Sequence, residues 1–297
     1  MKKIIFKGAG VALVTPMKNN GDINYDTLEK LIEFQIENST DAIITCGTTG
    51  ESATLSPKEH SQLIEFTLKK VSGRVPVIAG TGSNNTKTAL ELSKEAEEMG
   101  VDGLLIVTPY YNKTSQEGLI KHYTHIADNV NTPIILYNVP SRTGVNISPE
   151  TYYKLSKHPN ICATKEANGN LSSIAKTAVL CKDNLNIYSG NDDQIIPILS
   201  LGGIGVISVL SNICPKECHD MVKQFMDGNN ETSKNLQLKY LELIEALFCE
   251  VNPMPVKSAL NIIGLDCGNC RMPLTTLSQS SEKYLKDVLA KYNLIQK

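Results

Sequence analysis

Eight short apolar runs recur along the chain, and most of the intervals between them carry polar residues mixed with regularly spaced apolar ones. The runs are GVALVTP, DAIITCG, VPVIAGTG, GLLIVTPYY, PIILYNVP, ICATKEA, LNIYSG and GVISVLSN, and they start near residues 10, 42, 75, 103, 133, 161, 186 and 205. A repeat of roughly 20 to 33 residues has the length of one strand plus one helix. The pattern therefore predicts strands that alternate with helices.

The intervals between the runs show the period of an amphipathic helix. Residues 25–37 and 85–99 are two examples, in which apolar or uncharged residues return every three or four positions. The residues at this helical spacing are Leu28, Leu31, Ile32 and Gln35 in the first stretch, and Leu92, Ala96 and Met99 in the second.

The fold class predicted from this alternation is α/β. Runs that are apolar throughout, instead of at every second position, are typical of parallel strands buried on both faces. Eight β/α units predict a closed (β/α)8 TIM barrel. The alternative is a doubly wound open sheet, whose first strand would lead into a Gly-rich dinucleotide loop, whereas the first run here leads into TPMKNNGDIN.

The last quarter of the chain differs from the rest. After about Phe225 the strand-like runs stop, and the two segments NLQLKYLELIEALF and PMPVKSALNIIG have helical character. The prediction is a catalytic barrel over residues 1–224 and a C-terminal helical region over residues 225–297.

Composition limits the class of partner. The formal net charge is -2, with 20% charged and 41% hydrophobic residues, so no basic surface for nucleic acid is expected. The opening MKKIIFKGAG imitates a secretion signal, but Lys7 interrupts it and no small-residue cleavage site follows, so we interpret it as a first strand. No segment approaches the roughly 18 apolar residues of a membrane span. We predict a cytoplasmic protein that acts on small molecules.

Metal binding is not favoured by the cysteine and histidine pattern. Eight cysteines are spread over a long chain, which predicts reduced thiols. Cys267 and Cys270 in CGNC have the spacing of zinc ligands or of a redox pair, but the pair in CPKEC lies about fifty residues upstream without that spacing. His122 and His125 are interpreted as part of a solvated helix face. No metal site is predicted.

Lys165 stands at the end of the sixth apolar run. In a (β/α)8 barrel the active site lies at the C-terminal ends of the strands. An amine at the barrel mouth loses part of its hydration, which favours the neutral form that attacks a carbonyl to make a Schiff base. The alternative is a structural lysine paired with Glu166, and Lys165 by itself does not decide between the two.

Other strand ends favour the catalytic interpretation because they would place complementary chemistry at the same rim. Hydroxyl groups that transfer protons, backbone N–H groups beside glycines and a guanidinium that binds carboxylate all follow apolar runs. The residues concerned are Thr48 and Thr49 in CGTTGE, Tyr110 and Tyr111 in TPYYNK, and Tyr137 and Arg142 in YNVPSRTG.

A phosphorylated substrate is disfavoured by the loops after the seventh and eighth runs. Barrels often hold phosphate there with glycine-rich loops. Here the loops are SGNDD and SNICPKE, and Asp192 and Asp193 would repel a phosphate.

Taken together, GTTGES, TPYYNK, LYNVPSRTG, KEANGN and GVISVLSN resemble the signatures of the dihydrodipicolinate synthase and N-acetylneuraminate lyase family of pyruvate-dependent class I aldolases. The resemblance runs from about Phe6 to the C-terminus. The first threonine of GTTGE and Arg142 are similar to the synthase members. The resemblance then implies condensation of pyruvate with aspartate 4-semialdehyde to give 4-hydroxy-tetrahydrodipicolinate, in lysine and diaminopimelate biosynthesis.

The resemblance also implies roles for individual residues, and it implies that no metal or organic cofactor is needed. Lys165 would form the imine with pyruvate, and Tyr137 would be the central acid and base. Thr48 and Tyr111 would complete a hydroxyl relay, with Tyr111 supplied by a neighbouring subunit of a homo-oligomer, either a tetramer or a dimer. The groups implied to bind substrate are Thr48 and Thr49 for the pyruvate carboxylate, the backbone of Gly190 and Ile207, and Arg142 for the carboxylate of the semialdehyde.

Feedback by lysine is the point at which the sequence departs from the family pattern. Residues that bind lysine in sensitive members correspond here to Ser52, Ala53, His60, Asn84 and Tyr110. Pro57 replaces a histidine of the pattern, and Thr88 replaces the glutamate that would pair with the α-amino group of lysine. We expect a vestigial site with little or no inhibition.

Two alternatives to the synthase activity stay open at this level. A sister aldolase for 2-keto-3-deoxy sugar acids or N-acetylneuraminate would share Lys165 and Tyr137 but accept a polyol. A non-catalytic binder of 2-oxo acids would keep the barrel without the chemistry.

Overall fold

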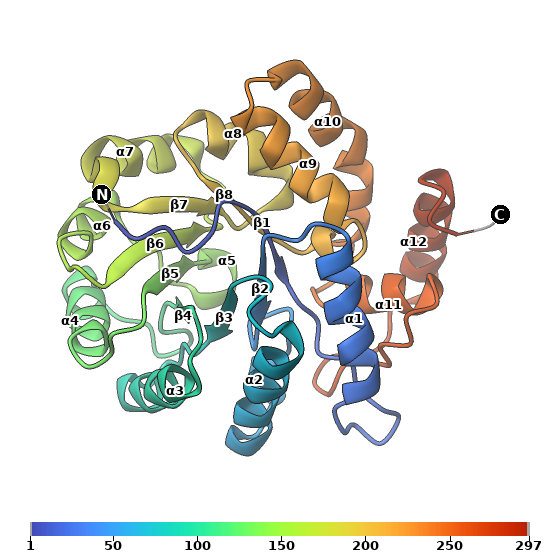
Figure 1. The fold of residues 1–297 in the computed structure, drawn as a ribbon, viewed down its shortest axis with the longest axis horizontal. Helices are drawn as coiled ribbons and strands as arrows, with labels where there is room; N and C mark the ends of the chain where they lie inside the picture. Colours follow the sequence, from blue (N-terminus) through green and yellow to red (C-terminus); the bar gives the residue numbers. More distant parts are fainter. Residues whose placement is uncertain (1, 296–297) are drawn as a thin grey trace.

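The computed structural model describes residues 2–295 of the chain. Eight parallel strands form a closed barrel in the order β1 to β8, as Figure 1 shows. The strands are β1 (Gly8–Ala12), β2 (Ala42–Thr45), β3 (Val77–Gly80), β4 (Gly103–Val107), β5 (Ile134–Asn138), β6 (Ile161–Glu166), β7 (Asn186–Ser189) and β8 (Gly205–Ser208). The barrel closes where β1 pairs with β8.

Helices surround the barrel on the outside (Figure 1). Within the described residues they are α1 (Tyr25–Glu37), α2 (Pro57–Val71), α3 (Thr86–Met99), α4 (Gln116–Ala127), α5 (Pro140–Thr143), α6 (Pro149–Leu155), α7 (Leu171–Cys181), α8 (Ile195–Ser200), α9 (Pro215–Met226), α10 (Asn230–Ala246), α11 (Met254–Ile262) and α12 (Gln279–Lys291). The predicted (β/α)8 barrel with helices after it is confirmed.

The strands are buried on both faces, which explains why their sequences are continuously apolar. Side chains that alternate inward form a separate core inside the barrel, with Ile44, Ile135 and Ile207 among its members. Those that alternate outward pack against the helices in a larger core. Lys165 follows the inward-facing Ala163 by two positions, so the period of the strand directs it into the barrel.

The first strand begins later than the opening residues suggested. β1 starts at Gly8, and Phe6 lies before it with its ring stacked on Tyr188 at a centroid distance of 4.4 Å. Tyr188 also donates a hydrogen bond of 2.7 Å to the carbonyl of Phe6. The apolar opening segment therefore packs beneath the barrel as its floor, and only its last residues enter the sheet.

The two helices predicted from the spacing of their apolar residues are both present, as α1 and α3. In α1 the buried residues include the predicted Leu28, Leu31, Ile32 and Gln35. In α3 the fully buried stripe is Ala89, Ser93 and Ala96, and Met99 is partly buried and packs against the core. Small residues on this stripe let α3 approach the barrel closely, and Leu92 instead lines a cavity at the barrel mouth.

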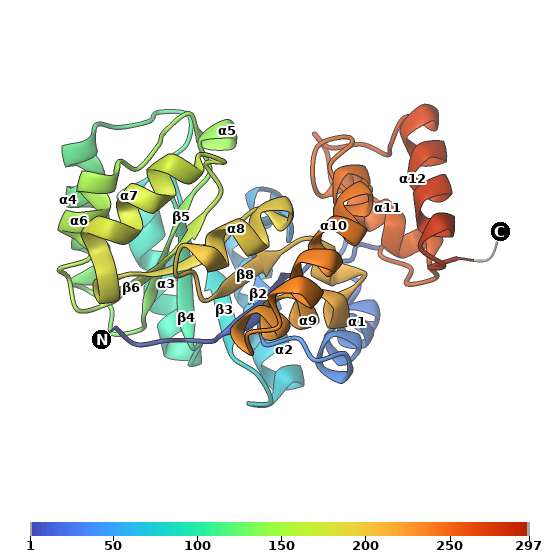
Figure 2. The same ribbon diagram turned by 90° about the horizontal axis from the view of Figure 1, so that it is seen from above.

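The C-terminal region is more closely joined to the barrel than the sequence division implies. The boundary predicted after residue 224 falls within α9, which packs on β1 and β8, and α10 packs on α9. Figure 2 shows α11 and α12 at one side of the barrel. The division into a barrel and a helical region remains a proposal, and α12 was not predicted as a separate helix.

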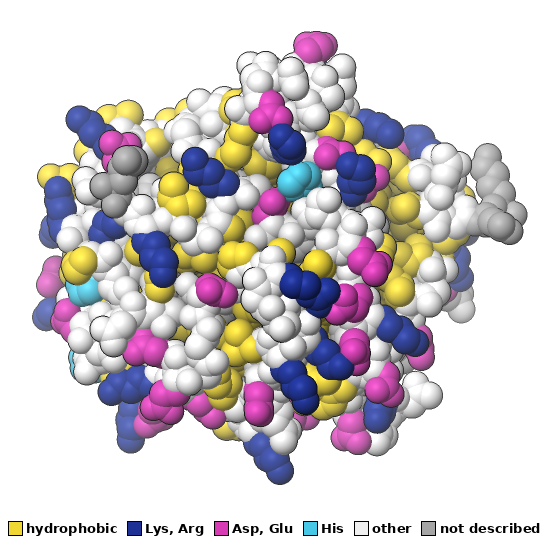
Figure 3. Space-filling view, in the orientation of Figure 1, with side chains coloured by type: hydrophobic (Ala, Val, Ile, Leu, Met, Phe, Trp, Pro, Cys, Tyr) yellow, Lys and Arg dark blue, Asp and Glu magenta, His cyan; other side chains and the backbone are white. Residues whose placement is uncertain are grey.

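The surface and the helix lengths bear on the class of partner. On the face drawn in Figure 3, acidic and basic side chains are interspersed. Across residues 2–295, no helix combines the length and the apolar character needed to span a membrane.

Candidate active site

Lys165 and Tyr137 lie side by side at the C-terminal ends of β6 and β5. They are partners in the register of the two strands. Lys165 Nζ lies 4.4 Å from the centroid of the Tyr137 ring, and both side chains are buried, with exposed fractions of 5% and 7%. A buried amine and a buried phenol in contact can exchange protons with a bound carbonyl compound, as Schiff-base chemistry requires.

Glu166 does not pair with Lys165. Its carboxylate leaves the opposite face of β6 and accepts hydrogen bonds from Asn138 Nδ2 at 3.0 Å, Tyr152 Oη at 2.8 Å and the backbone N–H of Asn168 at 2.9 Å. Within residues 2–295, Lys165 Nζ has no carboxylate at ion-pair distance. The structure therefore does not contain the structural Lys165–Glu166 pair that was the alternative to a catalytic lysine. Burial raises the pKa of Glu166 to about 7.

The loop after β2 brings Thr48 and Thr49 to the same rim. Thr48 is half-buried and lines the cavity at the barrel mouth. Thr49 is buried, and its Oγ1 accepts a hydrogen bond of 2.9 Å from Asn252 Nδ2. This contact fixes the hydroxyl of Thr49 from the C-terminal region.

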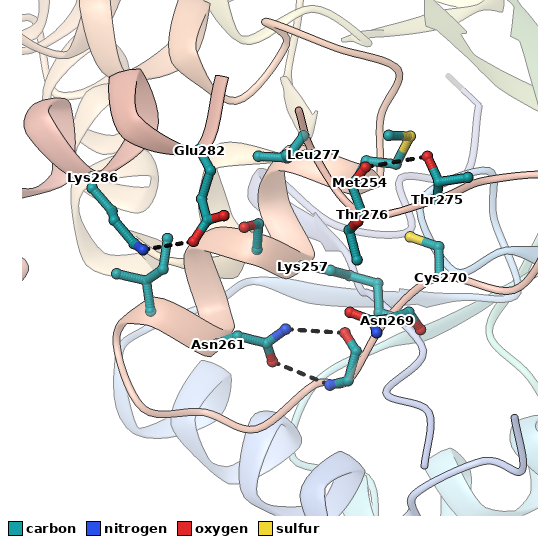
Figure 4. A pocket seen from close by; sticks show the side chains of 13 residues that line it. Met254, Lys257, Asn261, Asn269, Cys270, Thr275, Thr276, Leu277, Glu282 and Lys286 are labelled. Carbon is teal, nitrogen blue, oxygen red and sulfur yellow. Dashed lines mark hydrogen bonds and ion pairs between the residues drawn. The ribbon is translucent and has the colours of Figure 1, made fainter. Parts of the chain in front are cut away.

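A buried ion pair holds the same loop from below. Lys257 Nζ on α11 lies 2.7 Å from Glu51 Oε1, and Glu51 Oε2 accepts from the backbone N–H of Arg271 at 2.8 Å. Lys257 lines a second cavity of about 460 Å³, shown in Figure 4, whereas Glu51 lines the cavity at the mouth. The ion pair thus joins the walls of both cavities.

Arg142 stands on the short α5, directly after β5. Its side chain is exposed and lines the mouth cavity, and its Nη2 donates a hydrogen bond of 3.0 Å to the carbonyl of Asn252. One edge of the guanidinium is therefore held, and the remaining N–H groups are available for a carboxylate.

Gly190 follows directly after β7, and Ile207 lies within β8. The N–H of Gly190 donates to the carbonyl of Glu166 at 2.8 Å, which leaves its own carbonyl as the group it can offer. A Cβ at position 190 would lie 2.8 Å from the Cβ of Ala167, so only glycine fits. Ile207 belongs to the core inside the barrel.

Tyr110 and Tyr111 are adjacent in the sequence but lie in different surroundings. Tyr110 lines the mouth cavity. Tyr111 has an exposed fraction of 91% and a backbone φ of 68°. Tyr111 therefore does not complete a relay with Thr48 and Tyr137 within a single chain.

The mouth cavity has a volume of about 520 Å³, and four of the five residues expected to form the effector site line it, whereas Lys165 and Tyr137 are not among its lining residues. Ser52, Ala53, His60 and Tyr110 line it, together with Pro57 and Thr88. Asn84 instead lines a neighbouring cavity of about 330 Å³. His60 Nε2 lies 2.8 Å from the carbonyl of Gly80, and burial lowers its pKa.

The place at which barrels often bind phosphate is already filled by an aspartate. Asp192 Oδ2 accepts hydrogen bonds of 3.0 Å from the backbone N–H groups of Val209 and Leu210, at the start of the short 3-10 helix Leu210–Asn212. Asp192 is buried, and burial raises its pKa. These two N–H groups are engaged by Asp192, which agrees with the prediction against a phosphorylated substrate.

The residues weighed as metal ligands take other roles. His122 is buried, with its Nδ1 2.9 Å from Thr86 Oγ1, so the prediction of a solvated face was wrong for it. Burial raises the pKa of Cys267 and Cys270 to about 12, which disfavours the thiolates that zinc would need. In the part of the chain described, no three His, Cys, Asp or Glu residues form a group that could hold a metal ion.

A closed (β/α)8 barrel with a buried lysine against a tyrosine at its mouth defines a lyase of the class I aldolase type. The model of the dihydrodipicolinate synthetase family matches residues 5–292. The chain belongs to this family.

Similar proteins agree over nearly the whole length. The chain is 57% identical to the 4-hydroxy-tetrahydrodipicolinate synthase of Caldicellulosiruptor saccharolyticus, over 98% of both chains. The chloride-inhibited dihydrodipicolinate synthase of Acinetobacter baumannii, complexed with pyruvate, is 42% identical, with a TM-score of 0.96 over 98% of this chain and 100% of that one. The synthase of Cyanidioschyzon merolae, solved with lysine bound, is also 42% identical, with a TM-score of 0.96 over 99% and 100%.

Three residues at the site were not predicted from the sequence. They are Asn252, Glu51 and Lys257. Asn252 lies 203 positions along the chain from its partner Thr49, and Lys257 lies 206 positions from its partner Glu51. A local pattern carries no information on such contacts. Glu51 belongs to the GTTGE motif, where a charged residue follows four small or hydroxylated ones. That charge was the one local signal that could have drawn attention to Glu51.

Proposed function

We propose that this protein condenses pyruvate with aspartate 4-semialdehyde to give 4-hydroxy-tetrahydrodipicolinate, the activity named for its relatives. The contact between Lys165 Nζ and the ring of Tyr137 carries the proposal, because it places a nucleophile and a proton carrier together at the barrel mouth. The pathway served would be lysine and diaminopimelate biosynthesis.

In the proposed mechanism Lys165 attacks the ketone carbon of pyruvate. Water leaves as the imine forms, and the protonated imine withdraws electrons so that the methyl carbon loses a proton to give an enamine. The enamine carbon then attacks the aldehyde carbon of the second substrate. Tyr137, in contact with Lys165, would carry protons to and from these groups.

The binding groups follow from their positions around the mouth. The pyruvate carboxylate would meet the hydroxyls of Thr48 and Thr49, with the backbone of Gly190 and Ile207 on the opposite side. The carboxylate of the semialdehyde would bind Arg142, whose guanidinium is held by Asn252 on one edge only.

An oligomer is part of the proposal because the side chain of Tyr111 is almost fully exposed in the single chain. We propose a homotetramer in which Tyr111 enters the relay of a neighbouring subunit, and a dimer would meet the same requirement. Full activity at a concentration at which the protein is monomeric would contradict this role. The proposed location of the enzyme is the cytoplasm.

The test is a product assay with two second substrates. Pyruvate is supplied with aspartate 4-semialdehyde or with a polyhydroxylated aldehyde such as glyceraldehyde. We expect turnover with the semialdehyde to be at least about a hundredfold faster than with the polyhydroxylated aldehyde. The polyhydroxylated aldehyde has no carboxylate, so it would leave the guanidinium of the site without a partner. Preference for the polyol would identify a sister aldolase. Binding of pyruvate without turnover of any aldehyde would identify a non-catalytic binder.

A further inference from the structure

Asn252 connects the two proposed substrate subsites. It lies in the segment between α10 and α11, lines the mouth cavity and has an exposed fraction of 5%. Its Nδ2 donates to Thr49 Oγ1 at 2.9 Å, and its backbone carbonyl accepts from Arg142 Nη2 at 3.0 Å. A single residue thus contacts the group proposed for pyruvate and the group proposed for the second substrate.

The side-chain oxygen of Asn252 has no partner. Among the described residues, Oδ1 of Asn252 is a buried acceptor without a hydrogen bond. Buried polar atoms are rarely left unpaired, and those that are need a specific explanation, such as a ligand that supplies the missing donor. Nδ2 and the backbone carbonyl of Asn252 are both hydrogen-bonded, so Oδ1 is the unpaired polar atom of a residue that lines the mouth cavity.

We propose that Asn252 Oδ1 accepts a hydrogen bond from the α-amino group of the second substrate, and so distinguishes an amino-aldehyde from other aldehydes. This inference rests on the proposed function, in which Arg142 binds the α-carboxylate. The α-amino group is attached to the carbon next to that carboxylate. A carboxylate on Arg142 would hold the amine near Asn252, because Arg142 Nη2 lies 3.0 Å from the backbone carbonyl oxygen of Asn252.

A neutral amide suits the chemistry that follows condensation. To close the ring, the amine must lose its proton and attack the imine carbon. A new bond forms from the amine nitrogen to that carbon, the bond from the carbon to Lys165 Nζ breaks, and Lys165 leaves as a neutral amine, with no change of oxidation state. A carboxylate in place of the amide would stabilise the ammonium form and hold the proton on. Asn252 orients the amine without that penalty.

The experiment compares two ligands that differ only in the amine. At saturating pyruvate, wild type and Asn252→Ala are assayed for the Michaelis constant of aspartate 4-semialdehyde and for the inhibition constant of 4-oxobutanoate, the same aldehyde acid without the amine. Loss of a hydrogen bond to a charged donor is expected to raise the constant for the semialdehyde roughly ten- to a hundredfold. The constant for 4-oxobutanoate should stay within about twofold, because its contacts with Arg142 are unchanged.

Equal changes for both ligands would overturn the proposal, since they would show that Asn252 acts only through Thr49 and Arg142. Val251→Ala, in the same cavity wall, is the control and should not alter the ratio of the two constants. Asn252→Asp keeps the shape of the side chain and should shift the turnover profile to higher pH by about one unit, because its charge holds the proton on the amine. An unshifted profile would count against the proposal.

The proposed function is tested apart from Asn252 by the wild-type protein alone. If borohydride fails to trap pyruvate on wild type, or if wild type does not turn over the semialdehyde, the proposed function fails. If both succeed and the ratio for Asn252→Ala does not change, only the role of Asn252 is overturned.

Discussion

Lys165 and Glu166 are neighbours in β6, but their side chains leave the strand on opposite faces. Lys165 contacts the ring of Tyr137 inside the barrel, and Glu166 contacts Tyr152 on α6 outside it. The amine is therefore surrounded by the barrel interior instead of being neutralised by the adjacent carboxylate. The carboxylate joins the ends of β5 and β6 through Asn138 and so supports the geometry of the two inner residues.

Removal of the Tyr137 hydroxyl should slow turnover and leave pyruvate binding intact. Tyr137→Phe keeps the ring that packs against Lys165 but removes the proton carrier, so we expect kcat to fall by about 10² to 10⁴. Tyr123→Phe is the matched control, because it removes a buried hydroxyl on α4, outside the barrel, that donates to the backbone carbonyl of Ile106. Steady-state kinetics check both variants. An unchanged kcat for Tyr137→Phe would remove this residue from the mechanism.

Glu166 should make the stability of the protein depend on pH. Burial raises its pKa from 4.5 to about 7 in the folded state, so between these values the folded protein binds more protons than the unfolded chain. The free energy of unfolding should therefore fall as pH rises from about 4.5 to 7, by roughly 3 kcal/mol from this group. Urea titrations between pH 5 and 8 measure this. Glu166→Gln should flatten the profile, whereas Glu117→Gln on the exposed surface should not. A Glu166→Gln profile parallel to that of wild type would contradict the account.

The buried pair Lys257–Glu51 should be costly to break. Lys257→Met leaves the Glu51 carboxylate buried without its cation, and we expect a loss of about 3 to 5 kcal/mol in the free energy of unfolding. Lys286→Met breaks the exposed pair with Glu282 and should cost less than about 1 kcal/mol. Denaturant titrations compare the two. Similar losses in the free energy of unfolding for both variants would show that the buried pair stabilises the fold no more than the exposed one.

Lysine should be a poor inhibitor of this protein. Thr88 lines the mouth cavity at the position where a sensitive pattern has a glutamate, so the α-amino group of lysine lacks its carboxylate there. Loss of such a contact typically weakens binding roughly ten- to a hundredfold, and we expect little or no inhibition at millimolar lysine. A titration of turnover checks this, and half-inhibition below about a millimolar would contradict it.

A gain-of-function variant sharpens the lysine prediction. Thr88→Glu should lower the half-inhibitory concentration of lysine at least about tenfold. Thr86→Glu adds the same charge two residues away, at a site that lines the neighbouring cavity, and should have little effect. Equal responses of the two variants would indicate a general effect of charge.

The barrel could be predicted from the sequence because its strands are buried on both faces. The apolar runs mark the strands directly, and the residues that follow them, such as Lys165 and Thr48, come to the same rim by the geometry of the fold. The opposite directions of Lys165 and Glu166 were also accessible, because side chains alternate along a strand. This alternation places Lys165 and Glu166 on opposite faces of the strand, which excludes the alternative in which they form a pair.

Other features had weaker signals or none. His122 shares the buried face of α4 with Leu119, Tyr123 and Ile126. This spacing is typical of the buried face of a helix, so the burial of His122 could have been predicted from the sequence. Asn252 reaches Thr49 only because the chain returns to the barrel mouth after α10, and the sequence around it has no motif. Contacts of that kind depend on tertiary packing, which a local pattern does not encode.

The central claim is that Lys165 is the Schiff-base nucleophile, and reductive trapping tests it most directly. Wild type and Lys165→Ala are incubated with pyruvate and borohydride, digested, and analysed by mass spectrometry. The account predicts one reduced pyruvyl adduct on Lys165 in wild type and none in the variant. Absence of the adduct from wild type, or an equal yield of adduct in Lys165→Ala, would contradict it.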